Sequence, residues 1–213
     1  MKQRTDTPYW DNYYGNDLAP KPPSDFAKFC FNYTKPEKML IDLGCGNGRD
    51  SMFFCRSGLK VTAVDLSKSA IASFSQAMPI FALCDDFVKT KLLKCVDYDY
   101  AYARWTIHAI SKAQQDELLP NVYHALKPGG LFFSETRTIN DEKYGQGEAL
   151  SEHEFIFDEH YRRFLDPEEF LAQLKNIGFV IEHYEESDRF SVMNGDAPTL
   201  IRVVARKVMH GIL

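Results

Sequence analysis

The sequence predicts an α/β fold, in which a mostly parallel, doubly wound sheet carries helices on both faces. Three short runs rich in apolar and β-branched residues, at 39–43, 59–66 and 80–87, have the composition of strands. The first run leads through a glycine turn into a helical pattern from Asp50, as in the first half of a βαβ unit. The length of 213 residues suits one such domain and is short for two, so we expect a single domain over residues 1–213.

The glycine turn indicates which ligand the fold would bind. Gly44, Gly46 and Gly48 form a G-x-G-x-G pattern, whose missing Cβ atoms let a ligand approach backbone N–H groups. Arg49 stands where a dinucleotide fingerprint needs glycine or alanine, and no Lys-Ser or Lys-Thr pair completes a phosphate loop. Asp42 lies inside the strand, where its carboxylate would attract a cation. A cationic adenosine cofactor fits this combination, and S-adenosylmethionine carries both a sulfonium and an ammonium group.

The next two predicted strands also end in acidic residues. Asp65 closes the second strand, at the place where a carboxylate binds a ribose diol in folds of this class. Asp86 follows the third strand, where it could accept from an adenine amino group while Phe87 packs against the ring. Each acid could instead be a helix N-cap. Their common position at the carboxyl ends of strands favours ligand binding, because open α/β sheets bind ligands at that edge.

Together these motifs resemble the class I S-adenosylmethionine-dependent methyltransferases. The resemblance spans residues 39–207, and the Leu-Lys-Pro-Gly-Gly run at 126–130 is similar to a structural marker of the family. It implies a Rossmann-like, seven-stranded sheet with an antiparallel last strand, S-adenosylmethionine as cofactor and S-adenosylhomocysteine as product. The chain is similar in layout to small bacterial enzymes of the tellurite-resistance and phosphonate O-methyltransferase kind. The expected cofactor-binding residues in and beside the three motifs are Asp42, Gly44, Cys45, Gly46, Gly48, Asp65, Leu66, Asp86 and Phe87.

The N-terminal segment, residues 1–35, is expected to form a lid and a helix. Three tyrosines and a tryptophan lie within residues 9–14, which is too apolar for a free tail. In many small enzymes of the family such a segment closes over the cofactor, which would make Trp10 and Tyr14 cofactor contacts. The alternative is that these rings only cover a sheet edge. Ser24 is a candidate N-cap for the helix that follows.

The residues after the fourth predicted strand, 96–103, are expected to face the transferred methyl group. The family resemblance places Arg104 beside the cofactor and Trp105 beside the methyl acceptor. His108 is the one side chain nearby that could take a proton near pH 7, so it is a candidate general base or acceptor contact. The alternative is that it caps or packs against the helix that starts after Ser111.

A long connection, residues 138–165, separates the fifth predicted strand from the last predicted helix and is expected to build the acceptor site. Guanidinium groups match the oxyanions of phosphate, phosphonate and carboxylate, although these arginines could simply pair with nearby surface acids. If the segment is extended, only one of two consecutive arginines should face the pocket. The expected acceptor-binding residues are Trp105, Arg137, Tyr144, His160, Tyr161, Arg162 and Arg163.

Composition restricts the possible partners. A net charge of −5 and a pI near 5.7 argue against a nucleic-acid substrate and favour a small molecule, with an anionic group as one option. Five cysteines without a C-x-x-C pair predict reduced thiols, a cytoplasmic location and no metal site. The chain has no apolar run long enough for a membrane span, and we expect a monomer or homodimer. A non-catalytic S-adenosylmethionine-binding partner subunit is the alternative to an enzyme.

Overall fold

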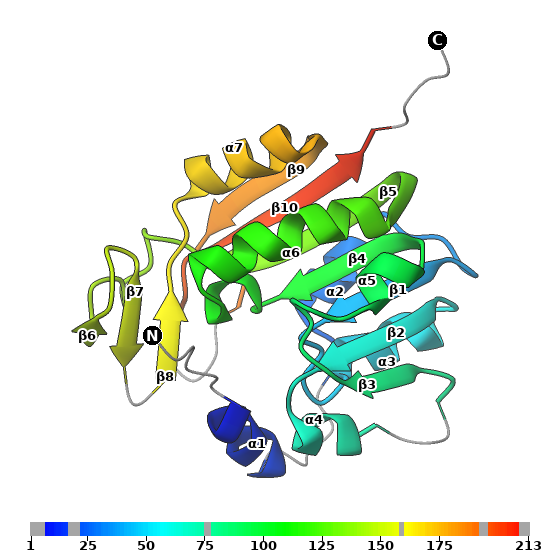
Figure 1. Cartoon of the computed structure of the whole chain (residues 1–213), viewed down its shortest axis with the longest axis horizontal. Helices are drawn as coiled ribbons and strands as arrows, with labels where there is room; N and C mark the ends of the chain where they lie inside the picture. The colour runs from blue at the N-terminus through cyan, green and yellow to red at the C-terminus, as the bar shows by residue number, and fades with distance from the viewer. Residues whose placement is uncertain (1–6, 17–21, 75–77, 158–159, 192–195, 209–213) are drawn as a thin grey trace.

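The computed structural model describes residues 7–16, 22–74, 78–157, 160–191 and 196–208. Among them, seven strands form one twisted sheet with helices on both faces, and a smaller three-stranded sheet lies beyond one end of it (Figure 1). The main sheet contains β1 (Met39–Leu43), β2 (Lys60–Asp65), β3 (Phe81–Cys84), β4 (Tyr98–Arg104), β5 (Leu126–Arg137), β9 (Phe179–Ser187) and β10 (Leu200–Lys207). The small sheet contains β6 (Glu148–Ala149), β7 (Glu154–Phe157) and β8 (His160–Arg163).

Seven α-helices and one 3-10 helix accompany these strands in the described part of the chain. They are α1 (Thr7–Asn16), α2 (Asp25–Phe31), α3 (Arg49–Arg56), α4 (Lys68–Ala72), α5 (Leu92–Cys95), η1 (Ile107–Ala109), α6 (Lys112–Ala125) and α7 (Pro167–Ile177). None of the described helices is both long and apolar enough to cross a membrane.

The strand order is β3-β2-β1-β4-β5-β10-β9. Strands β1 to β5 pair in parallel, whereas β10 runs antiparallel to both β5 and β9. This confirms the predicted doubly wound sheet with an antiparallel last strand. The chain reverses its direction of travel across the sheet between β1 and β4, and open α/β sheets bind ligands at the carboxyl ends beside such a switch point.

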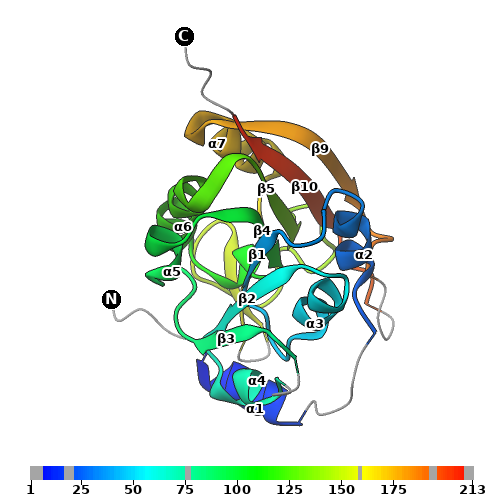
Figure 2. The ribbon, with the colours of Figure 1, turned by 90° about the vertical axis from the view of Figure 1, so that its right-hand side faces the viewer.

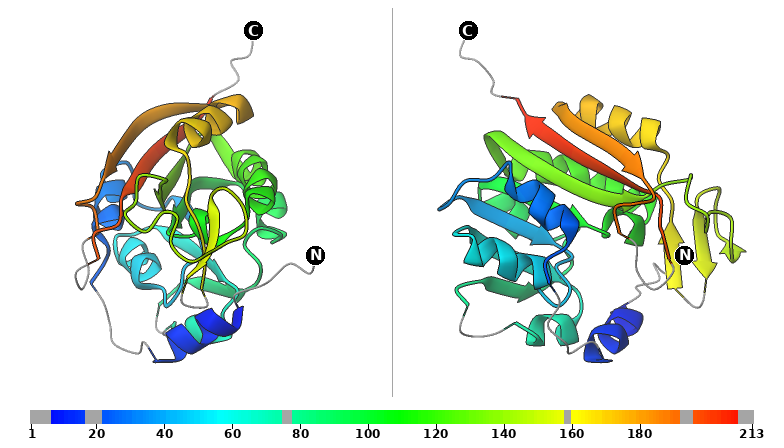
Figure 3. Two further views of the ribbon diagram at one scale, coloured as in Figure 1. Left: turned by 90° about the vertical axis from the view of Figure 1, so that its left-hand side faces the viewer. Right: turned by 180° about the vertical axis from the view of Figure 1, so that it is seen from behind.

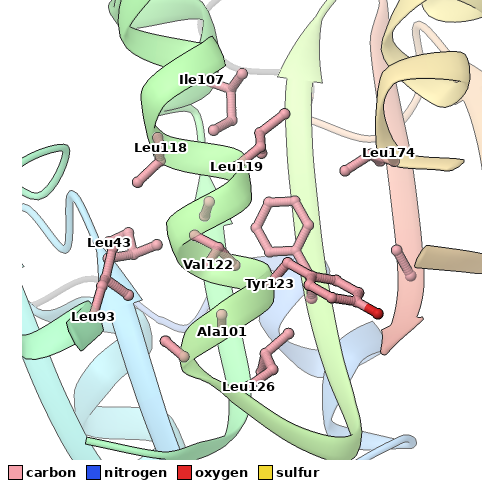
Figure 4. Packing of buried hydrophobic residues seen from close by; sticks show 14 of the residues in the cluster. Leu43, Leu93, Ala101, Ile107, Leu118, Leu119, Val122, Tyr123, Leu126 and Leu174 are labelled. Atoms are coloured by element: carbon pink, nitrogen blue, oxygen red, sulfur yellow. The ribbon is translucent and has the colours of Figure 1, made fainter. Parts of the chain in front are cut away.

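Each face of the sheet has its own hydrophobic core. Helices α5, α6 and α7 cover one face, and α2 and α3 cover the other (Figure 2). On the first face, Leu118, Leu119 and Val122 of α6 pack on β4 and β5 near Leu174 of α7 (Figure 4). On the second face, the fully buried rings of Phe26 and Phe54 contact Tyr102 of β4. Burial of these rings accounts for much of the stability because each aromatic side chain removes a large apolar area from water.

Local sequence signals explain where several helices begin. Ser24, Ser67 and Ser111 each cap a helix by accepting a hydrogen bond from the backbone N–H three residues later, as predicted for Ser24. Asp50 lies at the start of α3 and accepts from both the backbone N–H and the hydroxyl of Ser24, and from the Tyr102 hydroxyl. This buried carboxylate therefore ties the N-termini of α2 and α3 to β4.

Some predicted boundaries were wrong. Helix α4, which Ser67 caps, ends after five residues, and the Phe74 ring that follows lies against the Cβ position of Gly48. The third strand, expected at 80–87, is only β3. Strand β5 begins at Leu126, so the Leu-Lys-Pro-Gly-Gly run that resembles the family marker is part of an irregular strand start. The connection at 138–165 forms the three-stranded sheet seen at the side of the molecule in Figure 3.

Candidate active site

The glycine loop between β1 and α3 lies at the switch point of the sheet. Gly44 and Gly46 have φ values of +74° and +55°, which favour glycine. A Cβ atom on Gly44 would lie 2.1 Å from Cγ2 of Thr106, so the loop after β4 approaches the β1 loop closely at this point. No larger side chain fits there. The loop therefore depends on glycine at the carboxyl edge of the sheet, and side chains of Thr106, Tyr14 and Phe74 lie against Gly44, Gly46 and Gly48.

Asp65 joins the tip of β2 to this loop. Its Oδ2 atom accepts a hydrogen bond of 2.8 Å from the backbone N–H of Gly46, and Oδ1 accepts one of 2.9 Å from Ser67. Burial raises the pKa of the Asp65 carboxyl, although these two bonds act in the opposite sense. Each carboxylate oxygen can accept more than one hydrogen bond, so the residue keeps capacity for a ligand hydroxyl.

Asp42 is fully inside the sheet, and its Oδ2 atom accepts a 2.5 Å hydrogen bond from the Ser51 hydroxyl. Burial raises the pKa of Asp42 to about 8, and the charges of Asp50 and Asp65 add to this effect. The carboxyl is therefore largely protonated at neutral pH when no cation is near. This modifies the sequence-based interpretation, because Asp42 attracts a cation only as far as it gives up its proton.

The expected adenine contacts follow β3. Asp86 accepts from the backbone N–H of Val88 and so caps a turn, not the helix N-terminus considered from the sequence. Phe87 is buried, and its ring edge lies 3.5 Å from the Cβ position of Gly44. Leu66 is half-buried beside Asp65. Burial keeps the pKa of the Cys45 thiol well above its ordinary value, so this loop cysteine is a neutral thiol.

Helix α1 covers the loop from outside. Its Asp11 carboxylate accepts a 2.6 Å hydrogen bond from the Ser67 hydroxyl and a 3.3 Å bond from the Ser69 backbone, which latches α1 to α4 (Figure 1). The Tyr14 hydroxyl lies only 2.4 Å from the Cβ position of Gly46, and burial together with the Asp65 charge raises the Tyr14 pKa. Trp10 stacks on Tyr14 with ring centroids 5.9 Å apart. No described residue of α1 is fully buried, so these contacts rather than a core hold the helix in place.

The other end of α1 reaches β8. The Tyr9 ring stacks on His160 with centroids 4.3 Å apart, and Trp10 meets the same imidazole edge-on at 5.1 Å. One helix thus spans the glycine loop and the small sheet. The sequence pointed to the aromatic rings of this segment but not to Asp11, whose partners lie more than fifty positions away in the chain.

The residues after β4 form a third group. Arg104 donates from Nε to Oε1 of Glu135 at 3.0 Å, and its guanidinium lies 4.7 Å from the Trp105 ring centroid. Trp105 donates from its indole nitrogen to the same oxygen at 3.1 Å. The Arg137 guanidinium lies 5.6 Å from the centroid of the same ring. Glu135 was not expected from the sequence, although an acidic residue within an apolar strand is itself a sign of a buried ion pair.

His108 is buried next to Trp105, and its Nδ1 atom accepts a 3.2 Å hydrogen bond from the backbone N–H of Arg137. Burial, reinforced by the positive charge of Arg137, lowers the pKa of His108 well below its ordinary value. A neutral imidazole that accepts at Nδ1 carries its proton on Nε2. His108 can therefore donate a hydrogen bond from Nε2. It has no free nitrogen lone pair with which to act as the general base considered from the sequence.

Strand β8 divides its side chains between two faces, as pleated strands do. His160 and Arg162 face α1 and the β4–β5 loops, where Arg162 lies 5.4 Å above the Phe157 ring and where the charge of Arg137 affects its pKa. Arg162 Nη1 is buried and has no hydrogen-bond partner among the described residues. Arg137, in contrast, donates to Asp141 at 2.7 Å and to Asp196 at 3.1 Å.

Three expected acceptor residues do not join this group. Arg163 is buried and donates to the carbonyl oxygens of Ile107 and Ile110, so it anchors β8 to η1. Tyr161 shares the strand face of Arg163. Tyr144 donates to the carbonyl oxygen of Glu152 and packs within the small sheet's own aromatic cluster. A cleft of about 310 Å³ between the small sheet, α6 and α7 borders Arg163, away from the glycine loop.

The residues at the carboxyl edge fit S-adenosylmethionine. A Cβ atom on Gly44 or Gly46 would clash with neighbouring side chains, so the close approach of other groups to this backbone depends on glycine. Asp65 has spare acceptor capacity, and a nearby cation would favour the ionised form of Asp42. Because the Tyr14 hydroxyl contacts the face of Gly46, a ligand that reaches this backbone must share the space with Tyr14 or displace it. Among the residues that the structure describes, no three His, Cys, Asp or Glu side chains are placed to hold a metal ion.

Comparisons with known proteins agree with this reading. A family model for a methyltransferase domain matches residues 15–184. An uncharacterized methyltransferase of Synechocystis sp. is 25% identical over 97 residues, which is 46% of each chain. The chain thus spans about half the length of the curated relatives it matches.

Two solved structures show the same fold. A methyltransferase from Methanosarcina mazei has a TM-score of 0.74 at 16% identity, covering 85% of this chain and 98% of that one. The 1,6-didemethyltoxoflavin-N1-methyltransferase of Burkholderia thailandensis, with its substrate and S-adenosylhomocysteine bound, has a TM-score of 0.68 at 16% identity and coverages of 94% and 81%. The chain therefore belongs to the methyltransferase-domain family and has the class I fold of S-adenosylmethionine-dependent methyltransferases.

Proposed function

We propose that this protein transfers the methyl group of S-adenosylmethionine to a small molecule that carries an anionic group. S-adenosylmethionine would supply an electrophilic methyl group on its sulfonium. The glycine loop and Asp65 would hold the cofactor, and Phe87 would pack against its adenine ring. An acceptor atom would form a bond to this carbon as the carbon–sulfur bond breaks, and the electron pair would remain on sulfur. Holding the two partners in line provides most of the acceleration in such a displacement, so a catalytic triad is not required.

The proposal of an anionic acceptor depends mainly on the burial and the unpartnered nitrogen of Arg162. Its guanidinium is half-buried, its Nη1 is unpartnered among the described residues, and burial together with the nearby charge of Arg137 lowers its pKa. Asp141 and Asp196 raise the pKa of Arg162, but both carboxylates already accept hydrogen bonds from Arg137. A buried cation with an open donor is stabilised by an oxyanion, which a guanidinium fork binds strongly.

His108 supports the same conclusion. With Nδ1 occupied by the backbone of Arg137, its remaining Nε2–H can only donate. A donor beside Arg162 favours an acceptor that is already ionised, and an ionised oxygen or thiolate needs no general base before it attacks. The acceptor proposed for this site is therefore an anion at its reacting atom or next to it.

Incubation with methyl-labelled S-adenosylmethionine and an extract of small metabolites, followed by mass spectrometry, tests the proposal. The labelled product should carry a carboxylate, phosphate or phosphonate group. With that acceptor in hand, Arg162→Gln should raise the KM by about tenfold or more, as expected when a charged hydrogen bond worth about 1.5–3 kcal/mol is lost. Arg189→Gln is the matched control, because this guanidinium is 93% exposed.

Two results would contradict the proposal. A labelled product without any anionic group, or an unchanged KM in Arg162→Gln, would remove the argument for the acceptor class. Binding of S-adenosylhomocysteine without a labelled product from any extract would favour a non-catalytic cofactor-binding subunit instead.

A further inference from the structure

Glu135 is a buried carboxylate at the centre of the site. It lies in β5, is 0% exposed, and is hydrogen-bonded by three side chains from two other strands and the loop after β4. Its Oε1 atom accepts from Arg104 at 3.0 Å and from the Trp105 indole at 3.1 Å, while Oε2 accepts from Arg202 at 2.8 Å. A buried acid with this many charged or polar donors holds each of them in a narrow range of orientations.

Both the side chain and the backbone of Trp105 donate hydrogen bonds to Glu135. Besides the indole bond, its backbone N–H donates to the carbonyl oxygen of Glu135 at 2.8 Å. Trp105 has a φ of +60°, in the left-handed region that bulky side chains rarely adopt. Strained backbone of this kind persists where the surroundings over-determine it, and it clusters at functional sites. The two bonds to Glu135 are the hydrogen bonds that restrain the indole and its backbone, beside ring contacts with Arg104, Arg137 and His108.

The two side chains on Oε1 serve different parts of the site. Arg104 ends β4, which pairs with β1, and the following loop brings Thr106 against Gly44, so this residue lies beside the cofactor loop. Its Nη2 atom also donates to the Ser191 hydroxyl at 3.2 Å. The Trp105 ring faces Arg137 and His108, on the side where Arg162 lies. One carboxylate oxygen therefore sets the orientation of a group beside each of the two proposed ligands.

We propose that Glu135 is a positioning residue that fixes Arg104 toward the cofactor and the Trp105 indole toward the acceptor. The inference rests on the proposed function only for the identity of the two ligands. If Glu135 had only a structural role, its ion pair with Arg202 of β10 would be sufficient. The Arg202 guanidinium also lies 3.9 Å from the centroid of the Phe190 ring. The two bonds on Oε1 go beyond that pair, because both donors are residues of the site.

The chain contains two tryptophans, Trp10 and Trp105, so a Trp10→Phe background makes Trp105 the one tryptophan that fluoresces. In this background, Glu135→Gln and Glu135→Asp should shift the Trp105 emission to longer wavelength and increase its quenching by acrylamide at least twofold. The aspartate keeps the negative charge that Arg202 needs for folding but withdraws the carboxylate by one methylene. It tests positioning even if the glutamine variant does not fold.

Calorimetric titration of S-adenosylhomocysteine supplies the second readout, with Trp10 restored. Both Glu135 variants should bind about tenfold more weakly than the wild type, the loss expected when a charge-assisted contact is misplaced. Glu182→Gln is the control, because it breaks another Glu–Arg pair, with Arg206, between β9 and β10. Its affinity should stay within twofold of wild type.

An unchanged emission, or an affinity within twofold of wild type in a folded Glu135 variant, would overturn the inference. Failure of the wild type to bind S-adenosylhomocysteine would instead refute the proposed function. The emission of Trp105 would still show in that case whether Glu135 orients the indole.

Discussion

Replacing Asp42 with asparagine should flatten the dependence of stability on pH. Burial raises the pKa of this carboxyl from 3.8 to about 8 in the folded chain, so the folded state binds the proton more tightly than the unfolded state. The stability associated with this group is complete below about pH 4 and is lost as the pH rises toward 8. Because one pKa unit corresponds to 1.36 kcal/mol, the loss is about 1.4 kcal/mol per pH unit across this window.

Asparagine resembles the protonated acid in shape, keeps an acceptor for the Ser51 hydroxyl and does not ionise. Urea denaturation at pH 5, 6, 7 and 8, at constant ionic strength, measures the free energy of unfolding of both proteins. The wild type should lose about 1.4 kcal/mol more than Asp42→Asn for each pH unit between pH 5 and 7, and less between pH 7 and 8, where the folded carboxyl itself ionises. Parallel curves for the two proteins would show that Asp42 is ionised in the folded state and would refute the reasoning.

The same carboxyl links proton release to cofactor binding. A cationic ligand beside Asp42 favours its ionised form, so binding at pH 7 should release up to about one proton into the buffer. Calorimetry of S-adenosylmethionine binding in two buffers of different ionisation enthalpy measures this release, which Asp42→Asn should abolish.

Two further predictions concern the cofactor loop and the helix that covers it. Gly46→Ala should weaken S-adenosylhomocysteine binding at least tenfold in calorimetry, because the new Cβ atom would occupy space at the loop and clash with Tyr14. Gly145→Ala is the control: its backbone also has a positive φ, but its Cβ would lie in open space, so the affinity should not change. Asp11→Ala should speed the dissociation of S-adenosylhomocysteine several-fold in stopped-flow measurements, because it removes the latch to α4. Asp25→Ala removes an exposed acid from α2 and should not change that rate; equal rates in all three proteins would show that α1 does not retain the ligand.

The sequence was most informative where structure depends on neighbours in the chain. Strand periodicity and the glycine spacing predicted the sheet and the positions of Gly44 and Asp65, because a buried strand and a tight turn are set by the residues that form them. Strand alternation also anticipated that Arg162 and Arg163 would point to opposite sides.

The sequence was less informative where a side chain's role depends on a distant partner. The tautomer of His108 is set by a backbone N–H on β5, and Asp11 acts through a serine on another helix. Glu135 was not expected as a site residue, because its three donors come from β4, from the loop after β4 and from β10. Such contacts are properties of the assembled fold, which no window of sequence contains.

The most direct measurement is a crystal structure of this chain grown with S-adenosylhomocysteine. The ribose hydroxyls should lie on the Asp65 carboxylate, the adenine beside Phe87 and the methionine portion over the glycine loop, with the Tyr14 hydroxyl moved from its contact with Gly46. A ligand bound at any other surface, or an Asp65 side chain turned away from the sugar, would contradict the assignment of this edge of the sheet as the cofactor site.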